Sequence, residues 1–245
     1  QIKKENTPDK HKNKSVFVFV DIDDFYYKDQ DIGHLSLDIK DTDSYTAIDT
    51  KNTHLAGGAL SGEIRLNKSG NALSHFDLRW KNFDYNELMG IYGKAASVSG
   101  RATMEAHLKA QPGTIETFKK TVNGRVTLRA EEGRFDAKIL NIWGGGLLNA
   151  LIPSFDTEEQ ASLNCALMGA DFKDGLAQID PFIIDIRRVT LYGRGTYSAP
   201  DNVVDVVIKP ESKGVTLGDI STSVRLSGPP NDLSVRPDTV STLKK

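Results

Sequence analysis

Hydrophobic and polar residues alternate with a period of two along most of this chain. Leu35, Leu37 and Ile39 are typical, since a serine and an aspartate stand between them. Successive side chains of a β-strand point to opposite faces, so this alternation predicts strands with one apolar and one polar face. One-sided strands are typical of antiparallel sheets, because parallel sheets are usually covered on both faces. The apolar positions on the predicted face are Leu35, Leu37, Ile39, Ile64, Leu66, Phe76, Leu78, Met104, Leu108, Val126 and Leu128.

Short segments rich in glycine, proline and acidic or amide residues separate the alternating segments. They occupy residues 68–71, 131–133, 172–175, 199–202 and 228–231. These residue types favour tight turns, because they adopt or fix the backbone angles that turns require. The order of segments and turns predicts a series of β-hairpins.

Helical periodicity is confined to two segments. In the first, residues 114–121, Thr114 is a suitable N-cap, and Ile115 and Phe118 share one side. The second, residues 136–151, contains three consecutive glycines, which predict a kink because glycine destabilises a helix interior. We expect this second segment to cap one end of the sheet and to bury Trp143. Its apolar residues are Ile139, Ile142, Trp143, Leu147, Leu148 and Leu151.

The fold class predicted from these patterns is mainly β, with one or two short helices. A one-sided hairpin cannot bury its apolar face alone, so repeated hairpins predict a curved antiparallel sheet, either taco-like or sandwich-like. Residues 1–14 form a polar, flexible N-terminal segment in this scheme, and residues 238–245 form a polar tail. Between them, we expect a β-rich repeat segment at 15–112 and a C-terminal segment at 113–237 that continues the same sheet.

Composition excludes several classes of function. The charged residues, 26% of the chain, nearly balance to a net charge of −2, so no basic stripe is available to neutralise nucleic-acid phosphates. The single cysteine, Cys165, forms no internal disulfide, and we expect it to be a buried apolar residue. The longest run without charges, residues 139–155, is too short and too interrupted to span a bilayer. Any membrane anchor is therefore expected outside this sequence.

Asp21 and Asp23 are the strongest candidates for metal chemistry, because they follow an apolar strand and carboxylates are good ligands for Mg²⁺. A Mg²⁺-dependent phosphatase is one hypothesis for the chain. However, the other residues that such a phosphatase needs are not found in the sequence, and neither is a nucleophile elbow or a phosphate loop. We favour the interpretation that Asp21 and Asp23 mark a strand end in solvent, and we predict neither enzymatic activity nor a cofactor.

From residue 57 to about residue 237, the order of short glycine-containing motifs resembles the C-terminal region of the AsmA family of bacterial envelope proteins. The motifs occupy residues 99–106, 122–135, 163–175, 191–210 and 226–231. The resemblance implies a periplasmic module of a protein anchored in the inner membrane, with a role in outer-membrane biogenesis. It also implies phospholipid transport along a hydrophobic groove, with phospholipid or another acyl lipid as ligand and envelope proteins as further partners.

Under this interpretation the eleven apolar positions of the alternating strands line the lipid groove. The alternative is a structural or protein-docking domain whose apolar face is sealed. An open apolar face distinguishes the first interpretation from the second, because a densely packed core leaves no room for an acyl chain.

Overall fold

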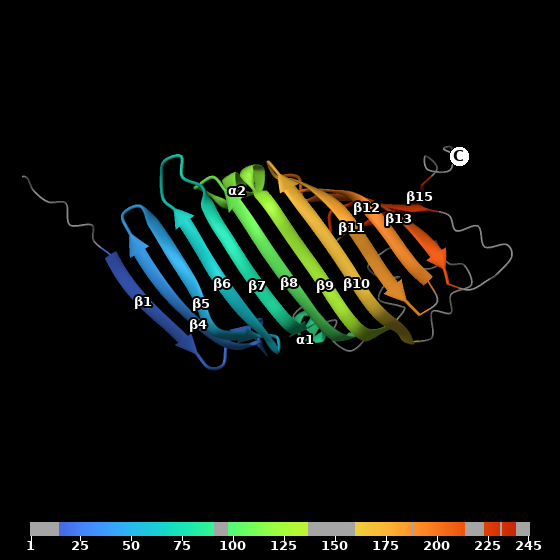
Figure 1. Ribbon diagram of the computed structural model, residues 1–245, viewed down its shortest axis with the longest axis horizontal. Helices are drawn as coiled ribbons and strands as arrows, with labels where there is room; N and C mark the ends of the chain where they lie inside the picture. Colours follow the sequence, from blue (N-terminus) through green and yellow to red (C-terminus); the bar gives the residue numbers. More distant parts are fainter. Residues whose placement is uncertain are drawn as a thin grey trace, which may run out of the picture.

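The computed structural model describes residues 15–90, 98–136, 160–187, 189–213, 223–230 and 232–238. Within these residues, thirteen strands form one antiparallel sheet in the order β1-β4-β5-β6-β7-β8-β9-β10-β11-β12-β13-β14-β15 (Figure 1). The sheet is curved and is not closed, which confirms the predicted curved antiparallel fold.

The strands of the N-terminal part are β1 (Ser15–Ile22), β4 (Gly33–Thr42), β5 (Tyr45–Leu55), β6 (Gly58–Asn67), β7 (Ser74–Asp84), β8 (Val98–Ala110) and β9 (Asn123–Asp136). Those of the C-terminal part are β10 (Gln160–Lys173), β11 (Leu176–Ile186), β12 (Val189–Ser198), β13 (Val203–Ser212), β14 (Val224–Gly228) and β15 (Ser234–Pro237). A separate pair, β2 (Tyr26–Tyr27) and β3 (Gln30–Asp31), and the helices α1 (Tyr85–Gly90) and α2 (Ile115–Thr121) complete the described elements.

Helix α2 lies where the sequence predicts it. The side chain of Thr114 accepts a hydrogen bond from the Thr117 amide, so Thr114 is the N-cap. The other predicted helical segment, with Ile139, Ile142, Trp143, Leu147, Leu148 and Leu151, lies outside the described residues, and its capping role stays a prediction.

Bulges keep the apolar residues of the long strands on one face. In β7 the register shifts between Trp80 and Phe83, and Asn82 adopts a positive φ of 58° within this bulge. Trp80 and Phe83 therefore share a face although three positions separate them, and their rings stack with centroids 4.3 Å apart. A similar bulge in β5 contains Asn52, with a φ of 50°. The extra residue of each bulge shifts the alternation by one position, so apolar residues on both sides of the bulge point to the same face of the sheet.

Residues 131–133 are not a turn, in contrast to the prediction. They lie inside β9, where the register against β8 shifts between the Gly100–Gly133 pair and the Ala102–Ala130 pair. The two adjacent glutamates and a glycine are accommodated as a bulge, which uses the same residue types as a turn. The turn predicted at residues 172–175 is confirmed, with Asp174 and Gly175 at φ 48° and 80° between β10 and β11.

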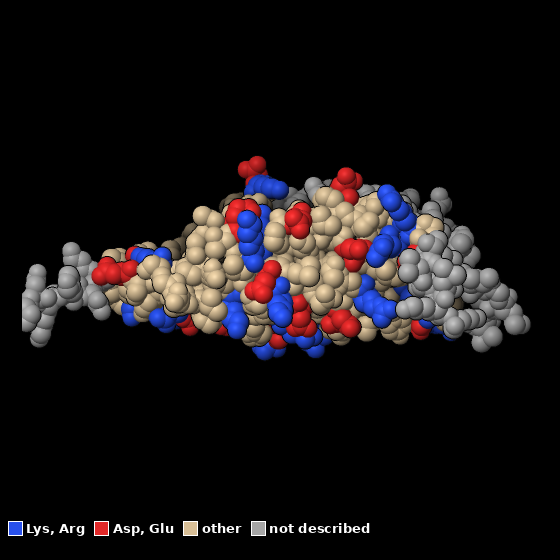
Figure 2. Space-filling view, turned by 90° about the horizontal axis from the view of Figure 1, so that it is seen from above, with Lys and Arg blue, Asp and Glu red and all other residues tan. Residues whose placement is uncertain are grey.

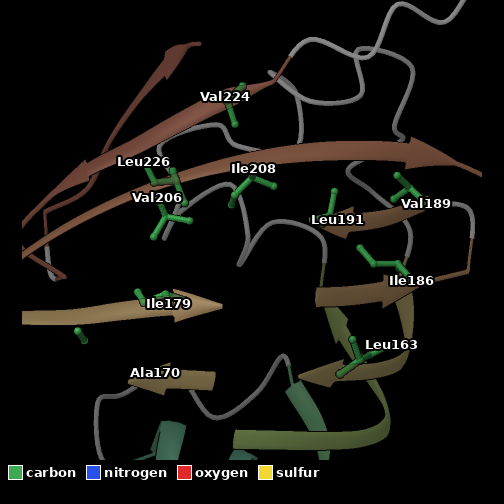
Figure 3. Close-up of a cluster of buried hydrophobic side chains, with 11 residues drawn as sticks. Leu163, Ala170, Ile179, Ile186, Val189, Leu191, Val206, Ile208, Val224 and Leu226 are labelled. Carbon is green, nitrogen blue, oxygen red and sulfur yellow. The ribbon is translucent and has the colours of Figure 1, made fainter. Parts of the chain in front are cut away.

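The C-terminal strands curl around a packed interior. Ile186, Leu191 and Ile208 have exposures of at most 1%, and Figure 3 shows them around one interior with other apolar side chains of β10 to β14. The buried members of this packed cluster are Leu163, Ala170, Ala177, Ile179, Ile186, Val189, Leu191, Val206, Ile208, Val224 and Leu226. Strand twist accounts for the curl, because it accumulates along a long sheet. The same sheet continues past residue 112, where the sequence suggested a boundary between segments.

Candidate functional site

The eleven apolar residues singled out in the sequence lie on one face of strands β4 to β9. Cross-strand pairing establishes this, because directly paired residues share a face. One row crosses the strands as Ile39, Ile48, Ile64, Phe76 and Leu108, each paired with the next. The full set is Leu35, Leu37, Ile39, Ile64, Leu66, Phe76, Leu78, Met104, Leu108, Val126 and Leu128. We call this set the open apolar face, and its lipid-binding role stays a prediction.

Two further rows run in the same direction. Leu78 pairs with Ala106, which pairs with Val126. Trp80 pairs with Met104, which pairs with Leu128 and through it with Met168 of β10. The rows follow the long axis of the sheet, across the strands. The sequence pattern does not mark Ile48, because this residue stands among alanine, aspartate and threonine residues that give only a weak alternation signal.

The open apolar face is less buried than the packed cluster of the C-terminal strands. Its side chains are half-buried, and Leu66 is 38% exposed. In the packed cluster every member is at most 8% exposed. Contiguous, accessible apolar surfaces are uncommon on soluble proteins.

Helix α1 borders the open apolar face at one end of the strands. Its residues Tyr85 and Leu88 pack with Met104 and Leu128 against the buried cluster around Phe83. The Tyr85 hydroxyl donates a hydrogen bond to the Ser99 carbonyl at 2.8 Å, which joins the helix to β8. A Cβ at Gly100 would lie 1.9 Å from this hydroxyl, so the close approach requires glycine there.

Helix α2 borders the same face at the other end of the strands (Figure 1). The ring of Phe118 meets that of Phe76 edge to face, with centroids 5.1 Å apart. Phe118 and Leu108 also pack against the buried cluster formed by Ala110, Val122 and Ala199. The two helices therefore border the rows of apolar side chains at opposite ends of the strands.

The opposite face of the sheet is polar, and its charges are paired across strands. Arg79 and Glu105 lie 2.8 Å apart, and Lys51 contacts Asp38. Arg125 and Asp171 form another cross-strand pair at 2.9 Å. Acidic and basic side chains lie interspersed along the elongated body in Figure 2. The sheet thus has one apolar and one hydrated face.

Asp21 and Asp23 lie near His34 at the C-terminal end of β1. Asp21 Oδ1 lies 2.9 Å from His34 Nε2, and Asp23 Oδ1 lies 3.9 Å from it. Among the described residues, no group of three or more histidine, cysteine, aspartate or glutamate side chains is arranged to hold a metal ion. Both carboxylates are largely exposed, at 71% and 95%. The sequence did not reveal the contact with His34, because thirteen positions separate the partners.

His34 is held at both ring nitrogens. Nδ1 lies 2.9 Å from the Asn52 carbonyl oxygen, and Nε2 lies 2.9 Å from the Asp21 carboxylate. Both partners only accept, so the two contacts together require the doubly protonated imidazolium. The Asn52 carbonyl and the Asp21 carboxylate accordingly raise the pKa of His34.

Cys165 is exposed, in contrast to the prediction that it is a buried apolar residue. The register between β10 and β11 shifts between Leu163 and Cys165, which inserts Asn164 as an extra residue. Leu163 points into the packed cluster, whereas Cys165 pairs with Asp185 on the polar face. The bulge therefore reverses the side that simple alternation would give.

A polar cavity of ≈ 420 Å³ lies near the ends of β8, β9 and β10. Its lining includes Glu132, Arg134, Ser99 and Ser162. These side chains do not suit an acyl chain, so we do not include the cavity in the candidate lipid site.

In the part of the chain that the structure describes, no helix combines the length and apolarity needed to cross a bilayer. Comparison with known proteins found no matching family model and no matching solved structure. The chain is similar to the AsmA family protein YhjG of Escherichia coli (strain K12), with 22% identity over 164 residues. The matched region is 66% of this chain and 24% of YhjG, so the chain spans about a quarter of that relative. This distant match supports the resemblance to the AsmA family that the ordered glycine motifs indicate.

Proposed function

We propose that this chain is a lipid-handling module of the bacterial cell envelope, with phospholipid acyl chains as its ligand. The observation that carries the proposal is the half-buried open apolar face, which continues across β4 to β9 without a described covering layer. Each methylene group transferred from water to such a surface contributes about 0.8 kcal/mol. An acyl chain lying along the rows would thus be bound mainly by the hydrophobic effect.

The size of the open apolar face suits this ligand. Six adjacent strands, β4 to β9, define five intervals, and a spacing near 4.8 Å gives a width of about 24 Å. One leaflet of a bilayer core is about 15 Å thick, which approximates the length of one acyl chain. A complete acyl chain therefore fits along the rows between α1 and α2. The packed cluster of β10 to β14 supports no such binding, so we assign lipid contact to the N-terminal strands.

The similarity to an AsmA family protein supports a proposal for the location and the biological role. We propose a periplasmic position, a tether to the inner membrane in the full-length protein, and a contribution to phospholipid transport and outer-membrane biogenesis. The paired charges of the polar face are compatible with an aqueous compartment, because they keep that face hydrated while the other face holds lipid. The proposal assigns no catalytic role to the chain.

Extraction of the purified chain with organic solvent, followed by mass spectrometry, tests the proposal. Val126 and Thr127 provide a matched pair, since both are half-buried neighbours in β9 and point to opposite faces. We expect phospholipid to co-purify with the wild type and with Thr127→Gln, and to fall several-fold in Val126→Gln. Wild-type protein that carries no lipid would instead favour the structural or protein-docking domain.

A further inference from the structure

The polar cavity near the ends of β8, β9 and β10 lies outside the open apolar face. Its volume of ≈ 420 Å³ falls within the range of about 300–1,000 Å³ that is typical of small-molecule sites. Every side chain of the described lining is polar, so the cavity suits a charged or strongly hydrogen-bonding ligand. The lining residues are Ser99, Gly100, Glu132, Gly133, Arg134 and Ser162.

Three of the lining side chains form one row across the strands. Arg134 of β9 pairs with Ser99 of β8 on one side and with Ser162 of β10 on the other. Directly opposite residues have Cβ atoms about 4.5–5.5 Å apart, so the two hydroxyl groups and the guanidinium lie within reach of one small ligand. A guanidinium only donates hydrogen bonds, and each hydroxyl can donate one. The row therefore offers several donors to an anion.

Cross-strand pairing places this row on the polar face of the sheet. The next row consists of Gly100, Gly133 and Leu163, and Leu163 belongs to the packed cluster. A Cβ at Gly100 or Gly133 would lie 1.9 or 2.1 Å from the Tyr85 hydroxyl, so Tyr85 also lies on the apolar side. Successive residues of a strand point to opposite faces, so the serine–arginine row points away from the packed cluster. The cavity can thus be occupied independently of the open apolar face.

Arg134 and Glu132 have unused binding capacity. In the described part of the chain, neither side chain forms a hydrogen bond or an ion pair. Arg79 and Arg125, which also lie on the polar face, both pair with an acidic residue of a neighbouring strand. Arg134 and Glu132 line the same cavity, so a ligand that carries both a negative and a positive charge can pair with both of them.

The donors of the row favour phosphate over carboxylate as the anionic group. A carboxylate has two oxygens, which one guanidinium already satisfies in a bidentate pair. A phosphate has further oxygens, which can accept hydrogen bonds from the two serine hydroxyls. Glu132 repels a purely anionic ligand but attracts an ammonium group beside the phosphate. The cavity therefore matches a phosphate and a primary amine in one small group.

We propose that this cavity binds a phosphoethanolamine group, with the phosphate at Arg134, Ser99 and Ser162 and the ammonium at Glu132. The group occurs as a lipid headgroup and in soluble phosphate esters, and both sources present the same chemistry to the cavity. None of the eleven residues of the open apolar face belongs to the described lining, so this site is separate from the proposed acyl-chain site.

Calorimetry of the full 245-residue chain with glycerophosphoethanolamine measures binding to the cavity. We expect saturable binding at millimolar ligand. Arg134→Gln should weaken binding about tenfold or more, because it removes charge-assisted hydrogen bonds to the phosphate. Arg129→Gln is the matched control and should leave binding unchanged, because Arg129 is another exposed arginine of β9 that does not belong to the described lining.

The assignment of Glu132 predicts opposite effects on two probes. Glu132→Gln should weaken the binding of glycerophosphoethanolamine several-fold. The same variant should strengthen the binding of glycerol phosphate, which has the phosphate but no amine. Glu131→Gln is the control, because Glu131 lies in the same bulge but outside the described lining, and it should change both affinities less. Equal effects of Glu132→Gln on the two probes would contradict the proposed position of the ammonium.

Vesicle flotation distinguishes the two sources of the group. It compares vesicles of pure phosphatidylcholine with vesicles of equal parts phosphatidylcholine and phosphatidylethanolamine. If a lipid headgroup occupies the cavity, the wild type binds more to the vesicles with phosphatidylethanolamine, and Arg134→Gln removes this difference. Binding of the soluble probe without such a difference supports a soluble phosphate ester as the ligand.

Circular dichroism verifies that all variants are folded. A wild-type chain that binds neither glycerophosphoethanolamine nor vesicles through Arg134 would overturn the proposal. So would a folded Arg134→Gln variant that binds glycerophosphoethanolamine as the wild type does. Phospholipid on the open apolar face should respond to Val126→Gln and not to Arg134→Gln, so the failure of either proposal is recognised separately.

Discussion

Met104 of β8 and Leu128 of β9 lie directly opposite each other on the open apolar face. Their neighbours Thr103 and Thr127 lie on the polar face, where they pair with Arg129 and Glu105. A step of one residue along either strand thus exchanges an apolar for a hydrated environment. The face of a residue therefore determines which environment its side chain contacts, and the proposed function depends on this separation.

Core truncations should distinguish the packed cluster from the open apolar face. Ile208 is completely buried, so Ile208→Ala should lower the free energy of unfolding by about 2–5 kcal/mol. Ile64 is half-buried, and Ile64→Ala should cost about 1 kcal/mol, because the deleted methylenes are partly hydrated already. Urea unfolding measures both values. Equal losses would show that Ile64 is packed as tightly as Ile208.

Asp21 and Asp23 should be dispensable for folding and for lipid loading. The double variant Asp21→Asn, Asp23→Asn removes both carboxylates while it retains the size of the side chains. Calorimetry with millimolar Mg²⁺ should detect no binding to the wild type. Metal binding that the double variant abolishes would support the phosphatase hypothesis and contradict the interpretation as a strand end.

The contact of His34 with Asp21 should make the attachment of β1 dependent on pH. The raised pKa of His34 means that folding favours the imidazolium. Its stabilising contribution is complete below the ordinary histidine pKa of about 6.5 and is lost as pH rises through the higher pKa of the folded protein.

Melting temperatures of the wild type and of His34→Gln, measured between about pH 5.5 and 8.5, test this direction of the pH dependence. The wild type should melt at a higher temperature than His34→Gln at low pH, and the difference between the two melting temperatures should shrink as pH rises. A difference for His34→Gln that grows with pH would contradict the assignment.

Much of the sheet could be predicted from the sequence, because alternation records directly which residues face the core. Leu35 to Leu128 fell on one face for this reason. The bulges were not predictable, since the extra residue in β9 consists of residue types that also form turns, and the extra residue in β10 reversed the side of Cys165. Helix α1 was missed because its six residues are too few for helical periodicity to be recognised. The contact of His34 with Asp21 depends on strand pairing, which composition does not encode.

Photo-crosslinking in cells tests the central claim most directly. Crosslinkers are placed singly at Met104 and Leu128, and at the adjacent positions Thr103 and Thr127, which share the same strands but face the other side. The proposed function predicts phospholipid adducts at Met104 and Leu128 and none at Thr103 and Thr127. Adducts at neither pair would indicate a sealed face, adducts at all four positions would indicate non-specific contact with membrane, and either result would contradict lipid binding on the open apolar face.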